Sequence, residues 1–344
     1  MSGLFAGLGV TSPVVAAPMA AGPTTPALVA AAGRAGALGF LAAGYRTPED
    51  LAVQIAAVRR AGTGAFGVNV FAPNPVAVDP GEFRAYAKAL DEDGQAYGLE
   101  LASAPIIEND DHWQAKIALL VGDPVPVVSF TFGLPPQGDL LALRRVGVMV
   151  LQTVTSVAEA RAAADAGVDG LVVQGAAAGA HSGTFTPDVL PPEVPLPELL
   201  RAVREAVPLP LVGAGGVATA DDVVAVLAAG AEAAMAGTAL LRTDESGASA
   251  VHKSALVELS TADTVVTRAF SGRPARALRT SFVDRFDARA PLGYPAVHHL
   301  TSPLRRAAAA AGDVERVSLW AGKRFRHARP GAARAALAGL AAKA

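Results

Sequence analysis

Short runs of apolar residues alternate with amphipathic segments along the first 241 residues of the chain. Eight of these runs are only four or five residues long and are bounded by turn residues, a pattern typical of buried parallel strands. Eight repeats of strand and helix predict an α/β protein, a closed TIM (β/α)8 barrel. The predicted strands are Val14–Ala17, Ala37–Leu41, Phe66–Val70, Val127–Phe130, Gly147–Leu151, Gly170–Gln174, Pro210–Ala214 and Ala233–Ala236.

Polar residues mark where the intervening helices begin. A helix is expected over Thr47–Arg60, because a threonine followed by proline and two acidic residues is typical of a helix N-terminus. A second helix is expected over Ser156–Ala166, where Ser156 and Glu159 have the spacing of a capping box. These alanine-rich helices predict a scaffold around the strands.

Two parts of the chain depart from this alternation. The interval of about residues 72–125 is too long for a plain loop, and its charged segment, Gly81 to Asp93, predicts a helical insertion that covers the barrel mouth. After about residue 244 the strand rhythm stops, and helical segments are separated by glycine and proline clusters. We therefore predict a barrel over residues 1–244 and a smaller, mostly helical lid over residues 245–344, ending in a helix at Ala332 to Ala344.

The composition limits the chemistry that the chain can perform. It contains no cysteine, which excludes disulfides, thiolate metal sites and a cysteine nucleophile. The formal net charge is -2, from 29 basic and 31 acidic residues, so we expect neither nucleic acid nor a membrane as partner. The segment Met1 to Phe5 lacks the basic start of a secretory signal. We expect a cytoplasmic monomer or homodimer that acts on a small molecule.

Amide side chains follow several of the predicted strands. In a βα barrel the carboxyl ends of the strands face the ligand, so Asn69, Gln152 and Gln174 are expected at one site. An amide carries both a donor and an acceptor, which suits the carbonyl and N–H edges of a flavin ring. The first strand ends in Ala17, Pro18 and Met19, whose backbone and thioether are suited to lie against that ring. The simpler alternative is that each amide only satisfies backbone groups at its strand end.

Small residues follow the last two predicted strands. Bare N–H groups in Gly213-Ala214-Gly215-Gly216 and in Ala236-Gly237-Thr238 predict a phosphate site. The segment Gly213–Ala218 also matches the dinucleotide pattern G-x-G-x-x-G/A. That fingerprint needs an acidic residue at the end of the following strand, whereas Glu232 precedes it. The phosphate loops of a barrel are therefore the preferred interpretation.

His181 is the candidate catalytic residue. It stands in a loop of small residues, Gln174 to Gly183, directly after the sixth predicted strand. An imidazole exchanges protons near neutral pH, which suits a general base. The alternative is a loop histidine that bonds a phosphate or the backbone. The other five histidines lack such a context, and no pair has metal-ligand spacing, so no metal is expected.

Several motifs together resemble one enzyme family. They are Ala17-Pro18-Met19, Gly67–Phe71, Ser129–Pro135, Gln152–Ser156, the His181 loop, Gly213–Gly216, Tyr294-Pro295 and Trp320–Gly322. This set closely resembles the nitronate monooxygenase (2-nitropropane dioxygenase-like) family. The resemblance implies a flavin-dependent oxidoreductase that uses FMN and O2 to convert alkyl nitronates or nitroalkanes to carbonyl compounds and nitrite.

The resemblance also implies roles for individual residues. FMN is contacted by the residues that match Asn69, Gln174, Gly179, Gly216 and the turn Met235-Ala236-Gly237-Thr238, with Gln152 nearby. The histidine that matches His181 acts as a base on a nitroalkane or orients a nitronate. Two positions depart from the family pattern, because Ala177 replaces an acidic residue and Ala180 replaces a glycine. Since alanine disfavours positive φ, we expect a different loop backbone before His181.

Other functions are compatible with some of the same residues. An NAD(P)H-dependent FMN reductase acting on an enoyl thioester or a quinone is similar in sequence. A flavin-binding barrel without turnover is suggested by the missing loop acid. A cofactor-free phosphosugar isomerase or aldolase would use the same phosphate loops but needs a lysine or carboxylate at a strand end. None of the eight predicted strand ends supplies one.

Overall fold

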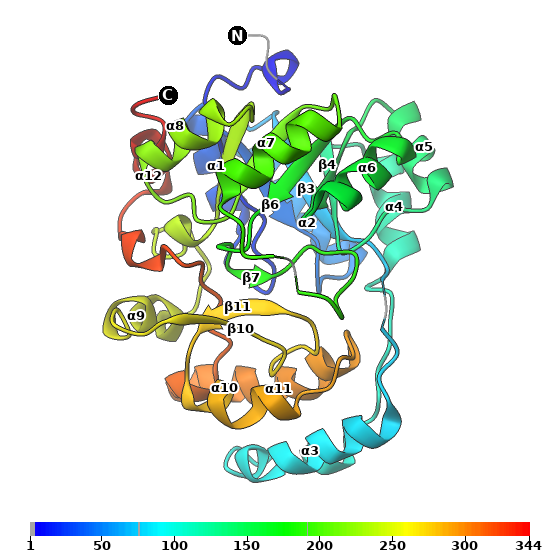
Figure 1. Ribbon diagram of the computed structural model, residues 1–344, viewed down its shortest axis with the longest axis vertical. Helices are drawn as coiled ribbons and strands as arrows, with labels where there is room; N and C mark the ends of the chain where they lie inside the picture. The colour runs from blue at the N-terminus through cyan, green and yellow to red at the C-terminus, as the bar shows by residue number, and fades with distance from the viewer. Residues whose placement is uncertain (1–3, 75, 191) are drawn as a thin grey trace.

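A closed barrel of eight parallel strands forms the centre of the molecule, as the alternation predicts. The computed structural model describes residues 4–74, 76–190 and 192–344 (Figure 1). The strands pair in the order β1-β2-β3-β4-β5-β6-β8-β9, and β9 closes the ring against β1. Their bounds are β1 Val14–Ala16, β2 Leu38–Ala42, β3 Phe66–Phe71, β4 Val127–Thr131, β5 Met149–Val154, β6 Gly170–Gln174, β8 Leu211–Ala214 and β9 Ala233–Ala236.

All eight predicted strands are confirmed, and the largest shift is at β5. The predicted strand begins at Gly147, whereas β5 begins at Met149 and continues to Val154. Gly147 has a φ of 83° and belongs to the turn that follows the preceding helix. The shift places Gln152 and Thr153 inside the strand, so that their side chains point to opposite faces of the sheet.

Helices surround the barrel and begin at the predicted capping residues. The Thr47 hydroxyl accepts a hydrogen bond from the Asp50 N–H, and the Ser156 hydroxyl accepts one from the Glu159 N–H. Both caps pair otherwise unsatisfied amides in the first turn and fix where each helix starts. The outer helices are α1 Pro26–Arg34, α2 Pro48–Arg60, α4 Trp113–Gly122, α5 Gln137–Arg145, α6 Val157–Ala166, α7 Leu196–Ala206, α8 Ala220–Ala228 and α12 Ala333–Leu340.

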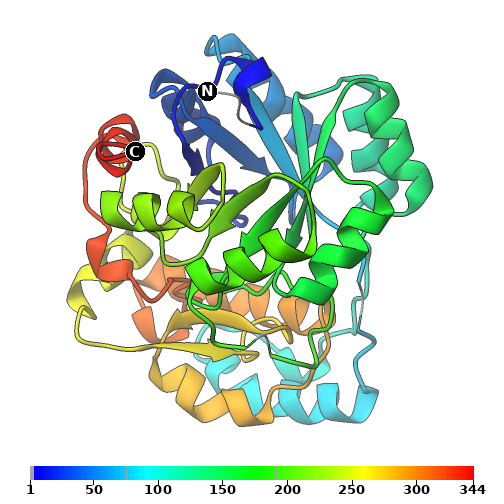
Figure 2. The same ribbon diagram turned by 45° about the horizontal axis from the view of Figure 1, so that its top comes forward.

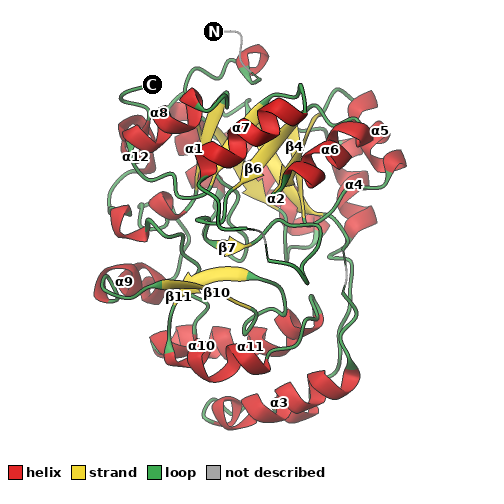
Figure 3. Ribbon diagram, in the orientation of Figure 1, coloured by secondary structure: helices red, strands yellow, loops and turns green. Residues whose placement is uncertain are grey.

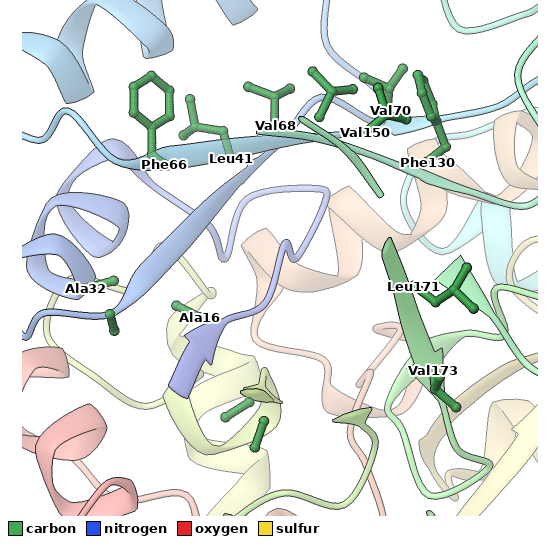
Figure 4. Close-up of a cluster of buried hydrophobic side chains, with 14 of the residues drawn as sticks. Ala16, Ala32, Leu41, Phe66, Val68, Val70, Phe130, Val150, Leu171 and Val173 are labelled. Carbon is green, nitrogen blue, oxygen red and sulfur yellow. The ribbon is translucent and has the colours of Figure 1, made fainter. Parts of the chain in front are cut away.

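Alternate residues of each strand pack into two different cores. Phe66, Val68 and Val70 of β3 all point towards the helices and belong to the core between strands and helices, which we call the outer core. Figure 4 shows these three side chains on one side of the strand. Leu151 and Met235 point into the barrel, which is filled by side chains from the other faces of the strands. Side chains alternate between the two faces along a strand, so the face on which the apolar residues pack also decides which strand-end side chains reach the barrel mouth.

A second layer, which we call the lid layer, covers one end of the barrel (Figures 1 and 2). Phe83 and Tyr86 of α3, from the insertion, share a core with Phe270, Phe282 and Phe286 from the C-terminal part. The insertion and the C-terminal part therefore pack as one body. The lid layer consists of α3 Pro80–Gln95, α9 Ala250–Glu258, β10 Thr264–Thr267, β11 Ala275–Leu278, α10 Ser281–Phe286 and α11 Ala296–Ala311.

The lid layer contains a small antiparallel sheet that the sequence pattern does not predict (Figure 3). Its order is β10-β11-β7, and β7 consists only of Ala180 and His181. His181 pairs with Ala275 of β11, and Ala180 pairs with Arg276. The sheet therefore ties the loop after β6 to the lid layer, although nearly a hundred residues separate the two strands in the chain.

The last helix returns to the barrel. Leu337 and Leu340 of α12 belong to the outer core and pack beside α1. Among the described residues, no helix is long and apolar enough to cross a membrane. Short 3-10 helices lie at η1 Ala6–Leu8, η2 Leu101–Ser103, η3 Thr238–Leu240, η4 Asp287–Arg289, η5 Val314–Arg316 and η6 Phe325–His327.

Candidate active site

A cavity of about 1090 Å³ lies between the carboxyl ends of the strands and the lid layer. This is the place where βα barrels hold their ligands, and the volume is at the upper end of the usual range for small-molecule sites. The structure brings most of the predicted site residues to its wall. They are Ala17, Pro18, Met19, Asn69, Gln174, Gly179, His181, Gly215, Gly216, Met235, Gly237 and Thr238.

Gln152 and Ala236, which were also expected at the site, do not line the cavity. Gln152 is fully buried, and its Nε2 lies 3.1 Å from the Thr153 carbonyl and 3.4 Å from the Phe130 carbonyl. Ala236 packs in the outer core. In each strand the neighbouring residue, Thr153 or Met235, faces the cavity instead. The alternation of side chains along a strand explains this correction.

The two predicted amides that line the cavity, Asn69 and Gln174, are largely engaged by the protein. The Nδ2 of Asn69 donates to the hydroxyls of Ser129 and Thr131, each at 2.9 Å. Gln174 donates from Nε2 to the His181 carbonyl at 3.1 Å and accepts from the Gly183 N–H at 2.7 Å. Gln174 therefore braces the loop that carries His181, which is the simpler of the two roles considered for a strand-end amide.

Main-chain N–H groups form a cradle at the loops after β8 and β9. Gly215 and Gly216 have φ values of 110° and 78°, which suit glycine and turn successive N–H groups to one side. In the described part of the chain, the N–H groups of Gly216, Gly237 and Thr238 donate to no protein acceptor. A Cβ placed on Gly216 would lie 3.1 Å from the Ala177 Cβ and 3.9 Å from the Arg324 Cγ, so a side chain there would crowd the loop after β6 and the residue beside the cradle.

Arg324 adds a positive charge beside this cradle. Its side chain lines the cavity, packs near Gly216 and lies 3.2 Å from the Asp222 carboxylate. Unpaired amides together with a guanidinium form a donor set suited to a phosphate. Arg324 lies in the segment after Trp320, and no sequence motif assigned it to the strand ends.

His181 sits in the cavity wall as a neutral imidazole. Burial, and to a smaller degree the nearby charges of Arg273 and Arg305, lower the pKa of His181 to about 3. Its Nε2 lies 2.9 Å from the Ser271 hydroxyl, and that hydroxyl donates its own proton to the Arg273 carbonyl at 3.1 Å. The hydroxyl therefore accepts from His181, which places the imidazole proton on Nε2 and makes Nδ1 an acceptor that no donor of the described residues reaches.

The backbone before His181 keeps a left-handed conformation in spite of the alanine. Ala180 has a φ of 63°, and the pairing of β7 with β11 holds it there. Five further non-glycine residues have positive φ among those described, and all of them line the same cavity. Backbone strain of this kind is concentrated at functional sites. These five residues are Ala21, Tyr45, Asp111, His112 and Phe132.

Aromatic rings and a buried cation form the part of the wall where the loops after β2 and β4 meet the lid layer. Tyr45 stacks on His298 with ring centroids 3.9 Å apart, and its hydroxyl accepts from the Tyr294 hydroxyl at 3.3 Å. Burial raises the pKa of Tyr45 to about 12, so the phenol stays protonated. Arg273 is fully buried behind the wall, with its guanidinium carbon 4.0 Å from the Phe132 ring centroid and two of its nitrogens unpaired.

Sequence reasoning missed these residues because they come from elements whose positions depend on tertiary packing. His112, His252, His298 and His299 were set aside for lack of context, yet all four line the cavity. They lie at or near the start of α4, in α9 and in α11, far from any strand end. Among the aromatic residues of this wall, Phe132, Tyr294 and Trp320 had a sequence signal, because they lie in the motifs Ser129–Pro135, Tyr294-Pro295 and Trp320–Gly322.

The chain is similar to proteins of one family over nearly its whole length. The model of the family described as nitronate monooxygenase matches residues 4–341. A "Probable nitronate monooxygenase" of Staphylococcus aureus is 35% identical over 324 residues, which cover 92% of this chain and 89% of the relative. Both matches cover the residues of the barrel and of the lid layer.

The chain is also similar to solved structures over nearly its whole length. A nitroalkane oxidase from Streptomyces ansochromogenes has a TM-score of 0.91 and 46% identity, covering 97% of this chain and 96% of that one. FabK from Thermotoga maritima is more distant, with a TM-score of 0.76 and 26% identity over 100% of this chain and 96% of that chain. The chain belongs to the nitronate monooxygenase family of flavin-dependent oxidoreductases.

Proposed function

We propose that this protein binds FMN and oxidises alkyl nitronates with O2, giving carbonyl compounds and nitrite. The observation that carries the proposal is a single cavity in which unpaired N–H groups of two strand-end loops and a neutral histidine line the same wall. The first feature suits the phosphate of a flavin mononucleotide and the second suits a small acidic substrate. The family and the similar nitroalkane oxidase support the same chemistry.

The residues present fit FMN. The Gly216, Gly237 and Thr238 amides and Arg324 would hold its phosphate, because they supply unpaired donors and a positive charge. Ala17, Pro18 and Met19 would lie against the ring, and the Asn69 and Gln174 amides would flank its polar edge. When bound, the flavin supplies the electron acceptor, and O2 is the final oxidant.

The protein's own contribution is to orient the substrate and to move its proton. The free Nδ1 of His181 accepts a proton from the α-carbon of a nitroalkane, while Ser271 keeps the ring fixed through Nε2. With a nitronate no proton transfer is needed, and His181 only positions the anion. Atoms and charge balance when two nitronates and one O2 give two carbonyl molecules and two nitrite ions.

The visible spectrum of the purified protein tests this proposal. We expect a flavin spectrum that is bleached when propyl-2-nitronate is added without oxygen, and that returns with nitrite formation when air is admitted. A colourless protein that fails to take up added FMN would refute the proposal. A flavin spectrum that propyl-2-nitronate leaves unchanged would also refute it.

A reductase function is the second candidate, because flavin-dependent reductases of enoyl thioesters and quinones resemble this chain in the same motifs. In an NAD(P)H-dependent reductase of enoyl thioesters or quinones, NADH or NADPH would bleach the flavin spectrum and a nitronate would not. Anaerobic mixing with each reductant in turn therefore separates the two candidates.

A further inference from the structure

Arg305 and His298, both on α11, form a pair in the cavity wall, which we call the roof pair. The Arg305 Nη2 lies 3.2 Å from the His298 Nδ1 and 3.1 Å from the His298 carbonyl. The Arg305 Nε donates to the Thr301 hydroxyl at 3.1 Å. These bonds lie within one stretch of helix and hold the two side chains in a fixed relation.

Arg305 determines which nitrogen of His298 carries the proton. A guanidinium has only donors, so the His298 Nδ1 must accept and the proton of the neutral ring resides on Nε2. The residue is only 7% exposed, and in the described part of the chain its Nε2 has no protein partner. This nitrogen is not one of the buried polar atoms without a partner, and it belongs to a residue that lines the cavity, so the N–H is open to the cavity. It is therefore available to a ligand.

The roof pair also carries a positive charge that the protein leaves unbalanced. Among the described residues, no carboxylate pairs with the Arg305 guanidinium, and its partners are neutral groups. Burial lowers the pKa of Arg305 to about 10, so the group remains charged at neutral pH. Three acidic residues line the same cavity, and each is engaged by other groups. Asp111 pairs with Lys116 at 2.7 Å, Glu108 accepts from the Val78 N–H at 2.9 Å, and Asp110 accepts from the His112 N–H at 3.1 Å.

The roof pair lies across Tyr294 from the candidate base. The Tyr294 ring centroid is 5.8 Å from that of His181 and 6.3 Å from that of His298. A substrate placed beside Tyr294 can therefore meet both histidines. A nitronate carries its negative charge on two oxygens, whereas a nitroalkane is neutral, so a guanidinium and an N–H donor in this wall favour the nitronate.

We propose that Arg305 and His298 form an anion subsite that binds the nitronate oxygens and makes the enzyme select nitronates over neutral nitroalkanes. This inference rests on the proposed function, since it names the form of the substrate that the site prefers. Arg305 acts as the specificity residue, and His298 supplies a donor whose orientation Arg305 maintains.

Nitrate, a planar oxyanion that is not turned over, is the probe. We expect isothermal titration of nitrate into the flavin-loaded protein to show binding, which Arg305→Met weakens by about 10- to 100-fold. His298→Phe removes the N–H but keeps a stacking ring against Tyr45, and it should weaken nitrate by about tenfold. Arg305→Lys should retain part of the affinity because it keeps the charge.

Arg306→Met is the matched control. Arg306 is the next residue of the same helix and lines the same cavity, but it is exposed and bonds only the Ser302 hydroxyl, at 3.0 Å. We expect its loss to change nitrate affinity by less than about twofold, since exposed charges contribute little. In turnover, Arg305→Met should raise KM for propyl-2-nitronate about as much as it weakens nitrate, and raise KM for 2-nitropropane by less than about threefold.

Three results would overturn the subsite. They are a wild-type protein that does not bind nitrate, an Arg305→Met variant with normal melting temperature and unchanged nitrate affinity, and an equal loss in Arg306→Met. If Arg305→Met does not fold, Arg305→Lys and His298→Phe decide, and normal nitrate affinity in both would also refute the subsite. Nitrate binding that depends on Arg305 in a protein inactive on nitronates would refute the proposed function and leave the anion subsite standing.

Discussion

Buried neutral histidines should make this protein unusually sensitive to mild acid. Burial is the main reason why the pKa of His181 is lowered to about 3 and that of His252 to about 4, and the pKa of His298 also lies well below its ordinary value. The unfolded chain takes up a proton at each position near pH 6.5, whereas the folded protein does not. Stability is therefore full above about pH 6.5 and is lost as the pH falls towards the folded pKa values.

The size of this loss of stability follows from the difference between the histidine pKa values of the unfolded and the folded protein. From pH 7 to pH 5, His181 and His252 each lower the free energy of unfolding by about 2 kcal/mol, because the unfolded chain holds a proton at each position over about 1.5 pH units in which the folded protein does not. Together they lower it by about 4 kcal/mol, which is a large part of the whole stability of many domains. His298 acts in the same direction. His252 offers the cleanest test, because its Nε2 donates to the Trp320 carbonyl at 3.1 Å and glutamine can replace that donor.

Urea unfolding of the flavin-loaded protein at pH 7, 6 and 5 is the assay. We expect His252→Gln to remove about 2 kcal/mol of the loss of stability between pH 7 and pH 5. His327→Gln is the control, because His327 is exposed on the surface, and its pH dependence should match that of the wild type. A His252→Gln variant that loses as much stability as the wild type would show that His252 is protonated in the folded protein, and would refute the reasoning.

Three further predictions concern the site itself. His181→Asn should lower kcat/KM for nitroalkanes by about 100- to 10,000-fold while the protein keeps its flavin spectrum. If the nitroalkane reduces the flavin of the variant as fast as that of the wild type in stopped-flow measurements, His181 is not the base. Gly216→Ala should weaken FMN binding by about tenfold or more in fluorescence titrations. Gly62→Ala is the control, because Gly62 has a similar φ of 79°, has open space around it and lies away from the cradle. It should leave FMN affinity unchanged. Ala180→Gly should raise the free energy of unfolding by about 1 kcal/mol, because glycine relieves the strain at a φ of 63°, and a loss of stability in urea would show that the loop is not strained.

The barrel and the glycine cradle could be predicted from the chain because their signals are local. Each strand of three to six residues is one apolar run, and each loop follows its strand directly, so the repeat places Gly216, Thr238 and His181 at one end. Errors arose where one residue of register matters. Gln152 and Thr153 are neighbours in β5, and only the packing of the helices decides that Thr153 faces the cavity and Gln152 does not.

The sequence by itself determined the eightfold repeat, the capped helices and the loops of small residues, because propensity, capping and periodicity act over a few residues. Only the tertiary structure decided the wall that faces those loops. Tyr45 and His298 stack although more than two hundred residues separate them, and β7 exists only because β11 lies beside it. Such contacts depend on the burial of α3, α10 and α11 in a common core, and that is a property of the whole chain and not of any one segment.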